Sequence, residues 1–307
     1  MATADSILAL ATAALNNDPK MVVSVCRSLA ANERESSTLR TRMEKLLAHA
    51  AHNWSNPGEL VPADIRGLLL QMMPNHTLHD VVLQENVAVE LTRFLEEWAH
   101  GEKIREAGFS VPNRVLLSGP PGNGKTTLAG AIADALDLPF LMVDFSTVLS
   151  SYLGETGSKL AKIFRGLSNT SCVLFLDEIE TVLSERSGSQ GKHDVGEMAR
   201  VVSSLLLEVD RLPNQVVLIG ATNHPEMLDR AVVRRFDHHW ELPAPDESVR
   251  QGWLDRFAAR YPGMPVEKFA FDTEGLSISD LERITEAHCR RWIVEQAQQL
   301  LTAEAAA

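Results

Sequence analysis

The sequence predicts an α/β fold in which helices cover both faces of a parallel β-sheet. Three observations carry this prediction. Short apolar runs alternate with stretches of helical periodicity between residues 114 and 242, a glycine-rich turn separates the first apolar run from a helix, and a later apolar run ends in two carboxylates. Such alternation is typical of parallel sheets, whose strands are apolar along their whole length because both faces are buried.

The elements of this sheet follow from the apolar runs and from the turn residues between them. Strands are expected at 114–118, 140–144, 172–176, 216–220 and 239–242. Helices are expected at 125–136, 159–167 and 196–209. Because helices lie between these strands in the sequence, the strands can pair in parallel.

The flanking segments divide the chain into four parts. Apolar residues at helical spacing predict a helical N-terminal module at 1–55, and turn residues predict a linker at 56–76. The sheet and its helices form a core at 77–243. Two prolines then open a C-terminal helical lid at 244–307.

Composition argues against several classes of protein. Acidic residues outnumber basic ones by 41 to 29, and the formal net charge is −12. Nucleic-acid binders gain most of their affinity from lysine and arginine on phosphates, so this balance argues against a nucleic-acid partner. No apolar run approaches the roughly 20 residues of a membrane span, and the N-terminus lacks a signal peptide's basic region. Cys26, Cys172 and Cys289 are scattered, which predicts reduced thiols and a cytoplasmic location.

The turn after the first strand predicts a phosphate site. Residues 119–126 fit the pattern G-x-x-x-x-G-K-[ST], between a strand and a helix as the pattern requires. Glycines let backbone N–H groups surround phosphate oxygens, and the helix N-terminus adds partial positive charge. We expect Lys125 to reach the β- and γ-phosphates of ATP and the Thr126 hydroxyl to bind Mg²⁺. The residues expected to bind the nucleotide here are Pro121, Gly122, Asn123, Gly124, Lys125, Thr126 and Thr127.

The acidic pair after a later strand matches this site. Asp177 and Glu178 follow the apolar run 173–176, at the sheet edge where ligands of such folds bind. Asp177 is expected to hold Mg²⁺, and Glu178 to polarise the attacking water, as an ATP hydrolase requires. The alternative is that the two acids form a simple turn.

A further segment identifies a family resemblance. Residues 219–237 resemble the second region of homology in the AAA clade of AAA+ ATPases. The resemblance implies that Asn223 is the sensor that helps to place water near the γ-phosphate. It also implies that Arg234 and Arg235 are arginine fingers acting on ATP bound by a neighbouring subunit. The working form would then be a homo-oligomer, expected to be a hexameric ring.

Other segments extend the resemblance over residues 76–300. The stretch 78–82 resembles the family's segment beside adenine, which assigns Asp80, Val81 and Val82 to the nucleotide site. Tyr152, Leu153 and Gly154 match the aromatic–hydrophobic–glycine pore loop, which in a ring would grip an extended protein substrate.

Two departures from the family pattern stand out. The finger loop is shorter, because the family's Gly-Arg between the finger arginines and Phe-Asp is missing, and the sequence leaves open whether Arg234 or Arg235 is the primary finger. In the lid segment, Ile278 and Ser279 replace the Gly-Ala of the family's G-x-S-G-A-D-L.

The whole chain is also similar to small bacterial AAA proteins whose genes often lie beside one for a subtilisin-like serine protease, in pairs linked to phage defence. The resembling stretches are 20–50, 152–156, 194–198 and 223–226. The expected function is ATP-driven remodelling or threading of a protein substrate, in partnership with a protease. The alternative is a nucleotide-controlled assembly switch that regulates a partner enzyme without threading. A third hypothesis is a DNA-handling AAA+ loader, which the acidic net charge disfavours.

Overall fold

A computed structural model describes residues 61–149, 153–183, 192–266, 269 and 272–306, together with Val25. The helical module expected at 1–55 lies outside the described residues apart from Val25, and Tyr152 also lies outside them. Within the described part of the chain, no helix is both long enough and apolar enough to cross a membrane.

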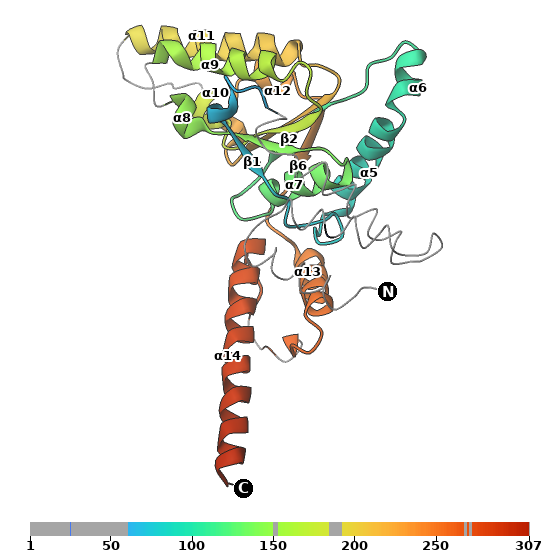
Figure 1. Ribbon diagram of the computed structural model, residues 1–307, viewed down its shortest axis with the longest axis vertical. Coiled ribbons are helices and arrows are strands. Elements are labelled where there is room, and N and C mark those ends of the chain that lie inside the picture. The colour runs from blue at the N-terminus through green and yellow to red at the C-terminus, as the bar shows by residue number, and fades with distance from the viewer. Residues whose placement is uncertain are drawn as a thin grey trace.

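The centre of the molecule is a sheet covered by helices (Figure 1). It has six strands in the order β1-β3-β4-β5-β2-β6. Five strands are parallel, and β1 is antiparallel to its neighbour β3. The parallel sheet and the positions of its five strands are confirmed. The strands are β1 (Leu69–Met72), β2 (Arg114–Ser118), β3 (Phe140–Val143), β4 (Cys172–Leu176), β5 (Val216–Thr222) and β6 (His238–Glu241).

Strand β1 occupies part of the stretch in which the sequence suggested a linker. A short 3-10 helix, η1 (Arg66–Leu68), precedes it, and Val61, Ile65 and Leu69 are buried. Gly166 makes room for this segment, because a Cβ there would lie 2.6 Å from Ile65 Cδ1. Burial of each such side chain contributes roughly 2 kcal/mol, so the segment belongs to the core.

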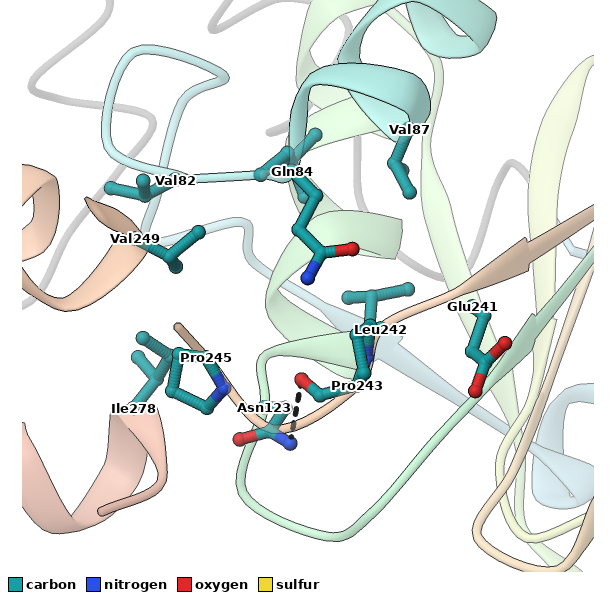
Figure 2. Close-up of a pocket in the computed structure, with 11 residues that line it drawn as sticks. Val82, Gln84, Val87, Asn123, Glu241, Leu242, Pro243, Pro245, Val249 and Ile278 are labelled. Atoms are coloured by element: carbon teal, nitrogen blue, oxygen red, sulfur yellow. Dashed lines mark hydrogen bonds between the residues drawn. The ribbon is translucent and has the colours of Figure 1, made fainter. Parts of the chain in front are cut away.

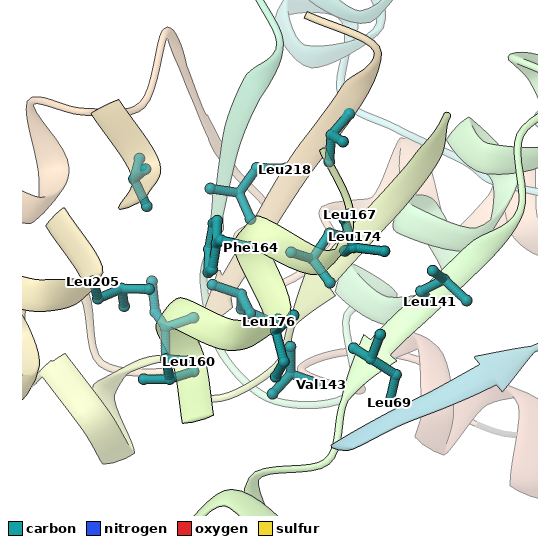
Figure 3. Packing of buried hydrophobic residues seen from close by; sticks show 14 of the residues in the cluster. Leu69, Leu141, Val143, Leu160, Phe164, Leu167, Leu174, Leu176, Leu205 and Leu218 are labelled. Carbon is teal, nitrogen blue, oxygen red and sulfur yellow. The ribbon is translucent and has the colours of Figure 1, made fainter. Parts of the chain in front are cut away.

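Helices cover both faces of the sheet. On one face α9 (Leu153–Gly166) and α11 (Lys192–Asp210) pack on alternate strand residues such as Leu174 and Leu176 (Figure 3). On the other face α5 (Glu85–Ala99) and α7 (Lys125–Ala135) pack on the intervening residues. The short helices of the same domain are α6 (Gly101–Glu106), α8 (Phe145–Leu149), α10 (Glu180–Leu183), η2 (Pro225–Met227) and α12 (Arg230–Val233).

The C-terminal part of the chain is helical, with α13 (Glu247–Arg260) and α14 (Ile278–Ala306). Figure 1 shows α14 extending away from the sheet domain. Its amino end contacts the glycine-rich loop, because Ser279 N donates to Gly122 O at 3.0 Å. Cys289 in α14 and Cys172 in β4 are free and buried, and burial raises the pKa of the Cys172 thiol to about 12.

Candidate nucleotide site

The glycine-rich loop leaves the carboxyl end of β2 through a glycine that the fold requires. Gly119 has a φ of +138°, and a Cβ there would lie 2.1 Å from the carbonyl oxygen of Leu242. Neighbouring strands fix this point, since Gly119 N donates to Thr222 O and Leu242 N donates to Ser118 O. The loop therefore starts from a backbone position that only glycine fills without displacing the next strand.

The rest of the loop wraps around the amino end of α7. Gly122 and Gly124 have φ values of +77° and +84°, in the left-handed region that favours glycine. A Cβ at Gly122 would approach Ser277 Oγ to 3.0 Å, so this glycine also permits the contact with α14. This geometry fits a phosphate, because the loop brings backbone groups and a helix N-terminus together.

Lys125 lies at the start of α7 and is buried. Its ammonium donates to Gly119 O at 2.7 Å and to Pro120 O at 2.9 Å, both within the loop. Burial lowers the pKa of Lys125, while the nearby Asp177 and Glu180 carboxylates act in the opposite direction. The carbonyls of the loop thus hold the ammonium in place.

Asp177 follows β4 and faces the loop. Thr126 Oγ1 donates to Asp177 Oδ2 at 3.3 Å, and Glu178 N donates to Asp177 Oδ1 at 3.0 Å. Burial raises the pKa of Asp177, and these hydrogen bonds and Lys125 oppose the rise. A hydroxyl beside a carboxylate is an oxygen donor set that suits Mg²⁺, so these two residues fit the expected metal.

Glu178 has an unusual backbone conformation. Its φ is +49°, one of two positive values among the described non-glycine residues. A non-glycine residue in this region costs free energy and is found most often where a side chain must take a particular position. The side chain of Glu178 is exposed, whereas Ile179 and Glu180 beside it are buried. The strained turn therefore directs this carboxylate out of the core at the sheet edge that carries the loop.

The carboxylate of Glu180 was not predicted as part of the site. Asn223 N donates to Glu180 Oε1 at 3.1 Å, which ties the segment after β5 to the acidic segment after β4. Glu180 is buried, and its Oε2 has no hydrogen-bond partner among the described residues. The only sequence signal for it was a third acidic residue two positions after Glu178.

A small pocket lies beside the loop, between the segment before α5 and the amino end of α14 (Figure 2). Val82 lines it, and Asn123 lies at its edge with Nδ2 donating to Pro243 O at 3.1 Å. The amide of Gln84, which was not predicted, points into the pocket. Most of the residues that line it are apolar.

Two of the residues expected beside adenine do not line this pocket. Asp80 Oδ2 accepts a hydrogen bond from Thr77 N at 2.8 Å, and Asp80 Oδ1 forms a salt bridge with Arg260 at 3.1 Å. The carbonyl of Val81 accepts from Arg256. Asp80 and Val81 therefore attach the segment to α13. Of the three residues expected beside adenine, only Val82 lines the pocket.

Arg234 and Arg235 lie apart from this site. They follow α12 and precede β6, whose first residues pair with the amino end of β2. The glycine-rich loop leaves the opposite, carboxyl end of β2. The described residues therefore bring Lys125, Thr126, Asp177 and Asn223 to one end of the sheet and the two arginines to the other. Leu153 and Gly154 form the start of α9.

Comparison with known proteins agrees with this geometry. The family model described as "ATPase family associated with various cellular activities (AAA)" matches residues 115–244. The chain is 34% identical over 235 residues to "Uncharacterized AAA family ATPase y4kL" of Sinorhizobium fredii, covering 74% of this chain and 68% of that protein.

Two further relatives are longer proteins. The chain is 36% identical over 236 residues to "Cell division cycle protein 48 homolog" of Archaeoglobus fulgidus, covering 73% of this chain and 31% of that protein. It is 35% identical over 217 residues to "ATP-dependent zinc metalloprotease FtsH" of Halothermothrix orenii, covering 68% and 34%. The chain thus spans about a third of each of these two relatives. Together with the glycine-rich loop and the sheet that carries it, these matches show that the chain belongs to the AAA family of ATPases and is an ATP-hydrolysing enzyme.

Proposed function

We propose that the chain uses ATP hydrolysis to remodel or thread a protein substrate, as one subunit of a homo-oligomeric, hexameric ring. The observation that carries the proposal is the division of the ATPase residues between two ends of one sheet. The phosphate loop, the acidic pair and Asn223 meet at one end, and the two arginines lie at the other. A complete site then needs the arginines of a second copy.

The residues at the phosphate end have distinct roles in this proposal. Lys125 binds the β- and γ-phosphates, Thr126 and Asp177 hold Mg²⁺, Glu178 takes a proton from the attacking water, and Asn223 orients that water. When bound, Mg²⁺ supplies positive charge that offsets the charge of the phosphates. The hydrogen bond from Asn223 N to Glu180 supports this arrangement, because it keeps the sensor segment beside the acidic segment.

The finer parts of the proposal rest on similarity. One relative carries the name ATP-dependent zinc metalloprotease, which supports the coupling of ATP hydrolysis to work on a protein. The resemblance to small bacterial AAA proteins extends the proposal to a subtilisin-like serine protease partner, phage defence and a cytoplasmic location. Co-expression with a subtilisin-like serine protease from the same organism, followed by co-purification, tests the pairing.

The threading part of the proposal predicts a selective loss in Tyr152→Ala. ATP binding, assembly and basal hydrolysis should stay within about two-fold of the wild type, since the predicted pore-loop residue does not belong to the phosphate site. Stimulation of hydrolysis by an unfolded protein such as casein should disappear, because an aromatic side chain grips an extended chain through its apolar area. ATPase assays with and without casein measure both quantities.

Tyr261→Ala is the matched control, because the chain has only two tyrosines and Tyr261 is an exposed residue at the end of α13. It should leave casein stimulation intact. If Tyr152→Ala keeps both casein stimulation and cellular function while Glu178→Gln loses cellular function, threading is wrong and the assembly-switch alternative is supported.

A further inference from the structure

We propose that Arg234 is the residue that enters the nucleotide site of a neighbouring copy, whereas Arg235 is a positioning residue that Asp210 holds within its own subunit. The division of roles rests on the proposed function, in which the two arginines serve a neighbour. It answers a question that the shortened loop leaves open in the sequence.

The two arginines lie at the opposite end of β2 from their own phosphate loop. Strands β2 and β6 are parallel, with Val115 opposite His238 and Ser118 opposite Glu241. The phosphate loop continues from Ser118, whereas the arginines come before His238. His238 and Glu241 are three residues apart in β6, so the start of β6 lies about 10 Å along the strands from the point where the phosphate loop leaves β2. The strand direction thus places the arginines away from their own phosphate loop.

The segment is also fixed at that far end. Asp237 Oδ2 accepts hydrogen bonds from Asn113 N at 3.0 Å and from Arg114 N at 3.1 Å, at the amino end of β2. The ring of Phe236 is buried over Gly220, where a Cβ would lie 3.0 Å from the ring. The arginines therefore project from an anchored base rather than from a free loop.

The guanidinium of Arg235 is occupied inside its own subunit. Its Nη1 donates to Ala231 O at 2.9 Å. Its Nε lies 3.3 Å from Asp210 Oδ1 and its Nη2 lies 3.5 Å from Asp210 Oδ2, so the contact is forked. Asp210 is the last residue of α11, and the Arg235 side chain is two-thirds buried. Arg235 thus links the finger segment to α11.

Arg234 has the opposite environment. Its side chain is exposed, and across the described ranges it has no hydrogen bond or ion pair. Its backbone closes α12, with Arg234 N donating to Arg230 O at 3.1 Å. Successive side chains of a helical turn point about 100° apart, so the two adjacent arginines cannot face the same way. The structure holds Arg235 inward and leaves Arg234 as the guanidinium available to a second copy.

The roles predict unequal losses of ATP hydrolysis. Arg234→Ala removes the cation that offsets charge on the transferred phosphoryl group, so kcat should fall by about 1,000-fold or more. Arg235→Ala and Asp210→Ala only displace that cation, so each should lower kcat by at most about 100-fold. The Arg235→Ala/Asp210→Ala double variant should be no worse than the stronger single variant, because the two residues act as a pair.

The control is Arg93→Ala, which removes an exposed arginine that pairs with Glu97 on α5, and it should leave kcat unchanged. A charge swap, Asp210→Arg with Arg235→Asp, tests positioning directly. It should restore part of the kcat that each single change removes. Thermal unfolding of every variant is recorded beside the ATPase rate. A loss in Arg235→Ala equal to or larger than that in Arg234→Ala, or a swap that restores nothing, would overturn the division of roles.

Mixed oligomers separate this inference from the proposed function. Co-expressed Arg234→Ala and Glu178→Gln subunits should recover activity, because the first has an intact phosphate site and the second has intact arginines. The control is the double variant Arg234→Ala/Glu178→Gln mixed with wild type. Its ATPase activity should not exceed the activity expected from the wild-type subunits present. Recovery with equal single-variant losses would overturn only the division of roles. Failure to recover at any ratio would overturn the shared site as well.

Discussion

Replacing Glu178 with glutamine should leave ATP binding intact and lower ATP hydrolysis by at least about 100-fold. The amide keeps the size and exposure of the side chain but cannot accept a proton from the attacking water. The substitution is also neutral for the backbone, because glutamine and glutamate bear the same cost at a φ of +49°. The loss therefore reports the carboxylate charge and not the strained turn. Single-turnover hydrolysis and equilibrium binding of ATP measure the two effects separately.

Glu106→Gln provides the control for this change, since Glu106 is an exposed carboxylate at the end of α6. It should hydrolyse ATP at the wild-type rate. Turnover near wild type in Glu178→Gln would show that another group is the base. Glu180 is another carboxylate of the same segment, but its Oε1 already accepts from Asn223 N and the side chain is buried.

Lys125→Ala should abolish ATP binding, because the loop loses the ammonium that we propose binds the β- and γ-phosphates. This ammonium donates to Gly119 O and Pro120 O. A phosphate would compete with those carbonyls for the same cation. In the alanine variant the two carbonyls lose their hydrogen-bond donor, so the loop should also unfold locally more easily. Isothermal titration with ATP measures the loss of binding.

Lys125→Met serves as the companion variant, since it keeps most of the apolar stem without the charge. It should bind ATP as poorly as Lys125→Ala but unfold at a temperature closer to the wild type. Wild-type ATP affinity in Lys125→Ala would refute the assignment of the phosphate loop. A loss of binding in alanine alone would indicate that packing, not charge, is what the loop needs from this residue.

Most of the sheet could be predicted because its strands are buried on both faces. Strand β4 is a continuous apolar run, and β2 has three buried apolar residues between Arg114 and Ser118; the structure places both strands where the sequence predicts them. The sequence did not predict strand β1, because Pro62 and Pro74 on either side of it are residues typical of a linker. Its place in the fold depends on the space left by Gly166, a residue far away in the sequence.

The site shows the same division between local and distant causes. The glycine-rich loop and the acidic pair are local patterns whose spacing is dictated by phosphate and metal chemistry. Glu180 could not be recognised from its neighbours, because its role is a hydrogen bond to the segment after β5. The difference between Arg234 and Arg235 likewise depends on Asp210, which lies on another helix.

An active site shared between two copies should make the specific ATPase activity depend on protein concentration. Wild-type chain is diluted from micromolar to nanomolar concentration in saturating Mg²⁺–ATP, and the mass of the species present is measured at each step. The activity per subunit should fall together with the loss of oligomer, because an isolated copy keeps its arginines at the end of the sheet remote from its own phosphate loop. A monomer that hydrolyses ATP at the same rate per subunit as the oligomer would contradict the account.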